Sequence, residues 1–102
     1  MPIELPIEAI ATLCRKYQVS ELSIFGSALR PDFSEHSDID LLVTFKPEAR
    51  IGLEYVQFQR ELAAVIGRKV DLVSKTGLKA VIREQVLAEA QVLYEDREAL
   101  PG

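Results

Sequence analysis

Apolar and polar positions follow two different periods along the chain, and these periods predict its helices and strands. Apolar side chains three and four residues apart, as on one face of a helix, occur in residues 6–17, 53–66 and about 78–90. Runs rich in β-forming residues occur in 19–25, 38–45 and 69–74. A short last strand, or else a cover for the core, is expected in residues 92–94. This order predicts a small α/β (α+β) domain in which helices flank a mixed β-sheet.

Local signals mark where several of these elements begin and end. Gly26 and Ser27 follow the first strand and predict a tight turn before a polar loop. Gly67 lies where a left-handed residue would end the second helix, and Thr76 is suited to cap the third. The strand in 38–45 has an almost continuous apolar half, which predicts that both of its faces are covered.

Composition narrows the classes of protein to which the chain can belong. Its 102 residues suit one domain spanning 1–102, with a core of about 7–94. No apolar run approaches the ~18 to 20 residues that cross a bilayer, so we expect a cytoplasmic protein without membrane contact. A net charge of −4 disfavours direct nucleic acid binding. One cysteine and one histidine exclude a Cys/His zinc site, so any bound metal needs oxygen ligands.

Two acids near the start of a strand are candidate metal ligands. In the run Asp38-Ile39-Asp40, both carboxylates point to the same face because side chains alternate along a strand. Close carboxylates repel each other, and a hard cation such as Mg²⁺, which prefers carboxylate oxygens, offsets this repulsion. Asp71 is a third acid within a short apolar strand, and it joins the other two if its strand lies beside theirs.

The turn before these acids is suited to bind phosphate. Gly26 and Ser27 offer backbone N–H groups and a hydroxyl without an obstructing side chain. Arg30, three residues later, carries a planar group that can hold phosphate oxygens. The chain therefore combines a candidate phosphate site with a candidate metal site on neighbouring strands.

The spacing of these residues resembles a known signature. Gly26-Ser27, ten intervening residues and Asp38-Ile39-Asp40 are similar to the Gly-Ser-x10-Asp-x-Asp motif of the DNA polymerase beta-like nucleotidyltransferase superfamily. Asp71 falls where the third carboxylate of that superfamily is expected. Over about residues 7–94, the chain resembles the minimal nucleotidyltransferases, or MntA-type antitoxins. The resemblance implies a polymerase beta-like fold and transfer of a nucleotide from a nucleoside triphosphate, with release of pyrophosphate.

The resemblance also implies a role for each site residue. Ser27 and the backbone after Gly26 would hold the triphosphate. Asp38 and Asp40 would coordinate two Mg²⁺ ions. Asp71 would bind the metal nearer the nucleophile and help to remove its proton.

The chain departs from the family beside this turn. Many members have a basic residue directly after the Gly-Ser pair and a glycine after the next arginine, where this chain has Ala28 and Pro31. Arg30 would therefore provide more of the phosphate binding, and a partner could add positive charge.

A partner protein is a further implication of the resemblance. Minimal nucleotidyltransferases are commonly paired with a small helical HEPN protein, a ribonuclease toxin. This chain would then be the antitoxin of a type VII-like pair and would transfer AMP from ATP to a tyrosine hydroxyl of its HEPN toxin. Two alternatives stay open: a non-catalytic antitoxin of the same fold that occludes the toxin, and a nucleotidyltransferase that modifies a small-molecule hydroxyl. Apolar residues on more than one face of 53–66 also fit a homodimer or hetero-oligomer.

Overall fold

A four-stranded mixed β-sheet forms the centre of the protein. The computed structural model describes residues 4–29 and 37–96. The strands follow the order β3-β2-β1-β4 across the sheet. Their bounds are β1 Val19–Phe25, β2 Ile39–Phe45, β3 Val70–Ser74 and β4 Gln91–Glu95. The pairs β1–β2 and β1–β4 are antiparallel, whereas β2 and β3 are parallel, so the mixed sheet predicted from the sequence is confirmed.

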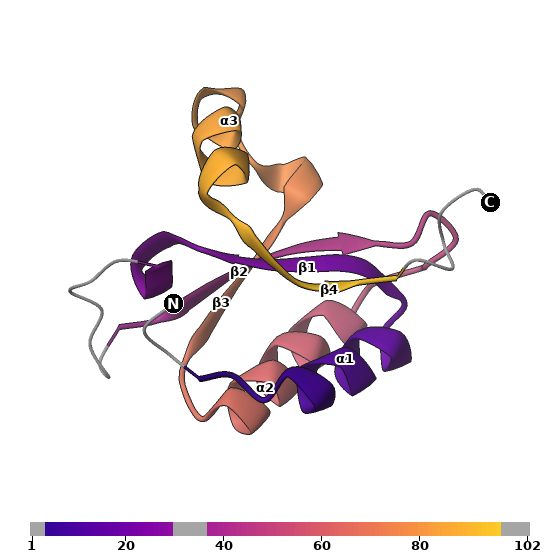
Figure 1. Ribbon diagram of the computed structural model, residues 1–102. Coiled ribbons are helices and arrows are strands. Elements are labelled where there is room, and N and C mark those ends of the chain that lie inside the picture. Colours follow the sequence, from indigo (N-terminus) through magenta and orange to yellow (C-terminus); the bar gives the residue numbers. More distant parts are fainter. Residues whose placement is uncertain (1–3, 30–36, 97–102) are drawn as a thin grey trace.

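Among the described residues, three α-helices lie on the two faces of this sheet. α1 Ile7–Lys16 and α2 Glu54–Ile66 pack side by side on one face, and α3 Ala80–Glu89 stands on the other (Figure 1). Two short 3₁₀ turns, η1 Gly26–Leu29 and η2 Lys75–Gly77, follow β1 and β3. None of the helices within the described ranges is long and apolar enough to span a membrane.

The hydrophobic core fills the space between the sheet and the helices α1 and α2. Alternate strand residues point into it and meet an apolar stripe on each helix. Fully buried members of the core include Ile10, Cys14, Leu22, Ile24, Ile39, Leu41, Val43, Phe58 and Leu62. Leu42 faces the opposite side of β2 and is only 3% exposed, so the second face is covered at this residue, whereas Asp40 and Thr44 on the same face are partly exposed.

The helix α2 also closes the outer edge of the sheet at β3. The carbonyl of Lys69 faces β2, because it accepts a 2.9 Å hydrogen bond from a backbone N–H of that strand. Carbonyl directions alternate along a strand, so those of Val70 and Leu72 face the outer edge. Gln59 Nε2 donates to the Val70 carbonyl and the Tyr55 hydroxyl to the Leu72 carbonyl, both at 2.7 Å. These side chains occupy acceptors that would otherwise form an open strand edge.

The elements predicted from the sequence are confirmed, with one correction at the third helix. Gly67 ends α2 in the left-handed conformation, with φ +78°. Residues 92–94 lie in β4, which pairs with β1. The prediction that Thr76 caps the third helix is wrong: Thr76 belongs to η2, and its hydroxyl lies 2.9 Å from that of Ser74. Because η2 takes up the residues after β3, Lys79 precedes α3 instead, without a side-chain cap.

Candidate active site

Two of the candidate acids lie side by side on the sheet. In the parallel pair β2–β3, Asp40 is the direct partner of Asp71. The strand residues on either side of each acid point into the core, so both acids face away from α1 and α2. Asp38 lies one residue before β2 and is exposed. Within residues 4–29 and 37–96, no three His, Cys, Asp or Glu side chains lie close enough to hold one metal ion together. The centre of the candidate site is therefore the pair Asp40 and Asp71.

The turn after β1 packs against the carboxylate of Asp40. Phe25 pairs with Asp40 across β1 and β2, which brings the next residue, Gly26, beside its side chain. Gly26 has φ +75°, and a Cβ at this position would collide with Oδ2 of Asp40. Glycine is therefore required for the backbone of η1 to approach this carboxylate so closely.

The residues predicted to bind phosphate lie at and after this turn. Ser27 belongs to η1 and directly follows Gly26. Arg30 and Pro31 lie outside the described residues. Ala28 is fully buried in the core, so its side chain adds nothing to a phosphate site. A buried position suits the alanine that this chain has where many family members have a basic residue.

A cleft of about 400 Å³ opens over the acidic pair. The sheet contributes Asp40 and Asp71, together with Phe25 and Val73. The other lining residues come from the end of η2, from the two residues before α3 and from α3 itself, and they are Gly77, Leu78, Lys79, Ile82 and Val86. The acids thus face a mainly apolar wall that carries one basic residue among those described. Lys79 is not among the residues singled out from the sequence, because the helical pattern there draws attention to its apolar positions.

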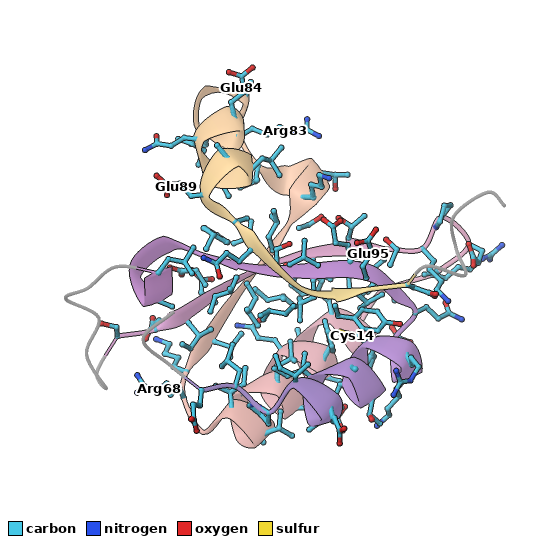
Figure 2. The ribbon with its side chains drawn as sticks, in the orientation of Figure 1. Cys14, Arg68, Arg83, Glu84, Glu89 and Glu95 are labelled. Atoms are coloured by element: carbon cyan, nitrogen blue, oxygen red, sulfur yellow. The ribbon has the colours of Figure 1, made fainter. Side chains whose placement is uncertain are left out.

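A second hollow, of about 340 Å³, lies beside the glycine turn. It is lined by Gly26, Leu29, Glu89 and Gln91. Figure 2 shows Glu89 projecting from the last turn of α3. Lys79, directly before α3, thus lines the cleft over the acids, whereas Glu89, the last residue of α3, lines the second hollow.

Tyr55 lies close enough to Asp71 for the charge of this acid to affect its pKa. Its hydroxyl donates to the carbonyl of Leu72, the residue that follows Asp71 in β3. Partial burial raises the pKa of Tyr55 above its ordinary value, and the nearby charge of Asp71 raises it further. The phenol therefore stays protonated, and remains a hydrogen-bond donor to β3, up to a higher pH than an ordinary tyrosine.

The chemistry of the acids fits a hard divalent cation. Asp40 and Asp71 present carboxylate oxygens from adjacent strands, and Asp38 lies two residues before Asp40. Mg²⁺ usually takes one or two protein carboxylates and completes its shell with water and substrate phosphates. The backbone of Gly26 lies against Asp40, so a phosphate bound at the turn would lie near such a cation. The role of each acid as a metal ligand stays a prediction.

Known proteins with similar sequences and structures identify the family. Residues 8–99 match the family described as polymerase beta, nucleotidyltransferase. The protein adenylyltransferase MntA of Thermococcus cleftensis is 39% identical over 88 residues, which cover 81% of this chain and 88% of that protein. A solved structure of a candidate minimal nucleotidyltransferase is 38% identical, with a TM-score of 0.71, and the match covers 83% of this chain and 86% of that one.

A more distant solved structure shares the fold. It is a complex of a tri-AMPylated HEPN toxin of Shewanella oneidensis with an MNT antitoxin. The matched chain is 21% identical, with a TM-score of 0.64, and the match covers 90% of this chain and 71% of that one. At this identity the likeness concerns the fold alone. Since the family match spans most of the sequence and the relative from Thermococcus cleftensis is 39% identical, the chain belongs to the polymerase beta family of nucleotidyltransferases.

Proposed function

We propose that this nucleotidyltransferase moves AMP from ATP to a tyrosine hydroxyl of a cognate HEPN ribonuclease toxin, and so acts as the antitoxin of a type VII-like pair. The observation that carries the proposal is the position of Asp40 opposite Asp71 and beside the Gly26 turn. The named activity of the relative from Thermococcus cleftensis, protein adenylyltransferase, supports AMP as the transferred group. The fold shared with a HEPN toxin complex supports the kind of partner.

Each group of site residues has its own role in this proposal. Ser27 and the backbone N–H groups after Gly26 bind the triphosphate. Asp38, Asp40 and Asp71 would hold two Mg²⁺ ions between them, and these ions would neutralise charge on the attacking and leaving oxygens. The protein then contributes mainly by positioning the two substrates and by stabilising charge.

One bond forms and one bond breaks in the transfer. The acceptor oxygen bonds to the α-phosphorus of ATP, the bond from that phosphorus to the bridging oxygen of the β-phosphate breaks, and pyrophosphate leaves. Asp71 accepts the hydroxyl proton, because its exposed carboxylate lines the cleft through which the acceptor enters. The apolar wall offers the aromatic ring of a tyrosine a surface on which to pack; it consists of Leu78, Ile82 and Val86. This wall favours a tyrosine of another protein over a small polar acceptor.

The mass of the partner tests this function. The protein is incubated with Mg²⁺, ATP and the candidate HEPN partner, which is the protein that the adjacent reading frame encodes. We expect that product to gain the mass of AMP, and EDTA to prevent the gain until Mg²⁺ is restored. The variant Glu84→Gln serves as a control, because Glu84 projects from α3 away from the sheet (Figure 2). This variant should label the partner as the wild type does.

A double variant, Asp38→Asn with Asp40→Asn, separates this function from the alternatives. It should leave the mass of the partner unchanged. If it labels the partner as well as the wild type does, or if the wild type adds no AMP, the proposal is wrong. Protection of cells by the double variant without labelling would instead indicate a binding antitoxin. Consumption of ATP only with an added small hydroxyl compound would indicate a small-molecule acceptor.

A further inference from the structure

Lys79 brings a positive charge to the cleft over Asp40 and Asp71. Its backbone carbonyl accepts hydrogen bonds from the N–H groups of Ile82, at 3.1 Å, and Arg83, at 3.0 Å. These bonds hold its backbone at the start of α3, while its side chain is exposed. The backbone of Lys79 is therefore held in place by hydrogen bonds, while its ammonium group lies exposed at the rim of the cleft.

The charges that line the cleft explain why a phosphate ligand needs this cation. Asp40 and Asp71 repel the triphosphate of ATP, so positive charge has to come from Mg²⁺ and from basic side chains. Lys79 is the basic residue among the described residues that line the cleft. No ion pair is found for its side chain within the described parts of the chain. Its ammonium group can therefore turn toward a bound ligand.

We propose that Lys79 binds an oxygen of the phosphoryl group that is transferred, a role that rests on the proposed function. The Gly26 turn reaches Asp40 from β1, whereas Lys79 enters the cleft from the segment after β3, the strand of Asp71. A triphosphate held at the turn then has its α-phosphate between the acids and Lys79. The ammonium stabilises the negative charge on the phosphoryl oxygens during transfer. A lysine suits this position, because its ammonium is a compact charge on a flexible stem.

Three variants of the full chain test the assignment. Lys79→Gln removes the charge, Lys79→Arg keeps it, and Lys75→Gln removes a charge four residues away that borders a different hollow. Each protein is titrated with AMP-PNP in the presence of Mg²⁺ by calorimetry, and its rate of AMP transfer is measured at saturating ATP. Loss of a charge-assisted hydrogen bond predicts about tenfold weaker binding and slower transfer for Lys79→Gln, with Lys79→Arg within about threefold of the wild type.

The outcomes separate this assignment from the proposed function. Lys75→Gln should match the wild type in both measurements, and thermal unfolding should show that all variants fold. Equal binding and equal transfer rates for Lys79→Gln and the wild type overturn the role of Lys79 alone. The same holds if Lys79→Gln changes only the KM for the partner, since the lysine would then contact the acceptor protein. Failure of the wild type to bind AMP-PNP overturns the proposed function and the assignment together.

Discussion

At the scale of single residues, the site depends on a close approach between Gly26 and the carboxylate of Asp40. The sequence predicts both residues, because the Gly-Ser pair and the two acids form a local pattern with a fixed spacing. Their contact could not be predicted, because it depends on the register that pairs Phe25 with Asp40. Lys79 could not be predicted as a site residue for a similar reason. It lies in the cleft because η2 comes between β3 and α3, and the helical pattern of the sequence does not predict this turn.

The first prediction concerns Gly26→Ala. The new side chain would occupy the left-handed region at φ +75° and would collide with Asp40, so the turn or the acid must move. We expect the free energy of unfolding to fall by about 1 to 3 kcal/mol, and AMP transfer to be lost. Urea denaturation and the transfer assay measure these effects.

A second glycine provides the matched control for this substitution. The nearest atom to a Cβ at Gly52 is Oε2 of Glu54 at 3.7 Å, which is an ordinary contact, and Gly52 does not have a positive φ. Gly52→Ala should therefore stay within about 0.5 kcal/mol of the wild type. Equal stability of the two alanine variants would contradict the strain argued for Gly26.

The variant Asp71→Asn is predicted to change the titration of Tyr55. Burial is the larger cause of the raised pKa of Tyr55 and the charge of Asp71 the smaller one, so the substitution removes the smaller cause alone. Tyr55 should then ionise at lower pH than in the wild type, but still above its ordinary value. Ultraviolet absorbance during an alkaline titration measures this, with Tyr55→Phe to identify the signal and Glu84→Gln as a variant that leaves it unchanged.

The raised pKa of Tyr55 also fixes the sign of a pH effect on stability. Its folded-state pKa lies above its unfolded value, so the stabilisation is fully present below the unfolded pKa and is lost as the pH rises through the folded pKa. In Asp71→Asn only the folded-state pKa falls, so this loss should begin at the same pH as in the wild type but end at lower pH. Identical titrations of Tyr55 in the two proteins would show that the charge of Asp71 does not reach the phenol.

At the scale of elements, α2 stabilises the fold in two ways: one side packs into the core, and another binds the edge of the sheet. Its apolar stripe, which includes Phe58 and Leu62, was predictable from the helical period and packs into the core. Its polar residues Tyr55 and Gln59 bind the free edge of β3. This second task could not be predicted, because it requires the strand order to place β3 at the edge of the sheet.

The hydrogen bond from Gln59 to β3 gives a prediction for this pairing. Gln59→Ala leaves the outward carbonyl of Val70 without its donor, so we expect the free energy of unfolding to fall by about 1 kcal/mol. Hydrogen exchange at β3 should become faster. Gln57→Ala, at an exposed position of the same helix, should change neither quantity. If both alanine variants behave alike, the edge contact does not stabilise β3.

At the scale of the whole molecule, the two faces of the sheet differ. One face is closed by α1 and α2 and contains the core, while the acids and the cleft lie on the face where α3 stands (Figure 1). The fold class was predictable, because strand and helix periods alternate clearly along the chain. The association of strands was not, since β2 and β3 are far apart in sequence and only the folded sheet makes Asp71 the neighbour of Asp40.

The parallel pairing of β2 and β3 has a consequence for protein synthesis. Asp40 leaves the ribosome well before Asp71, and the whole of α2 lies between their strands. Parallel strands cannot pair until the segment that connects them has been made. A nascent chain that ends within α2 therefore carries half of the acidic pair and no site. The enzyme becomes competent only after translation has passed β3, so synthesis that stops before β3 yields fragments that lack the assembled acidic pair.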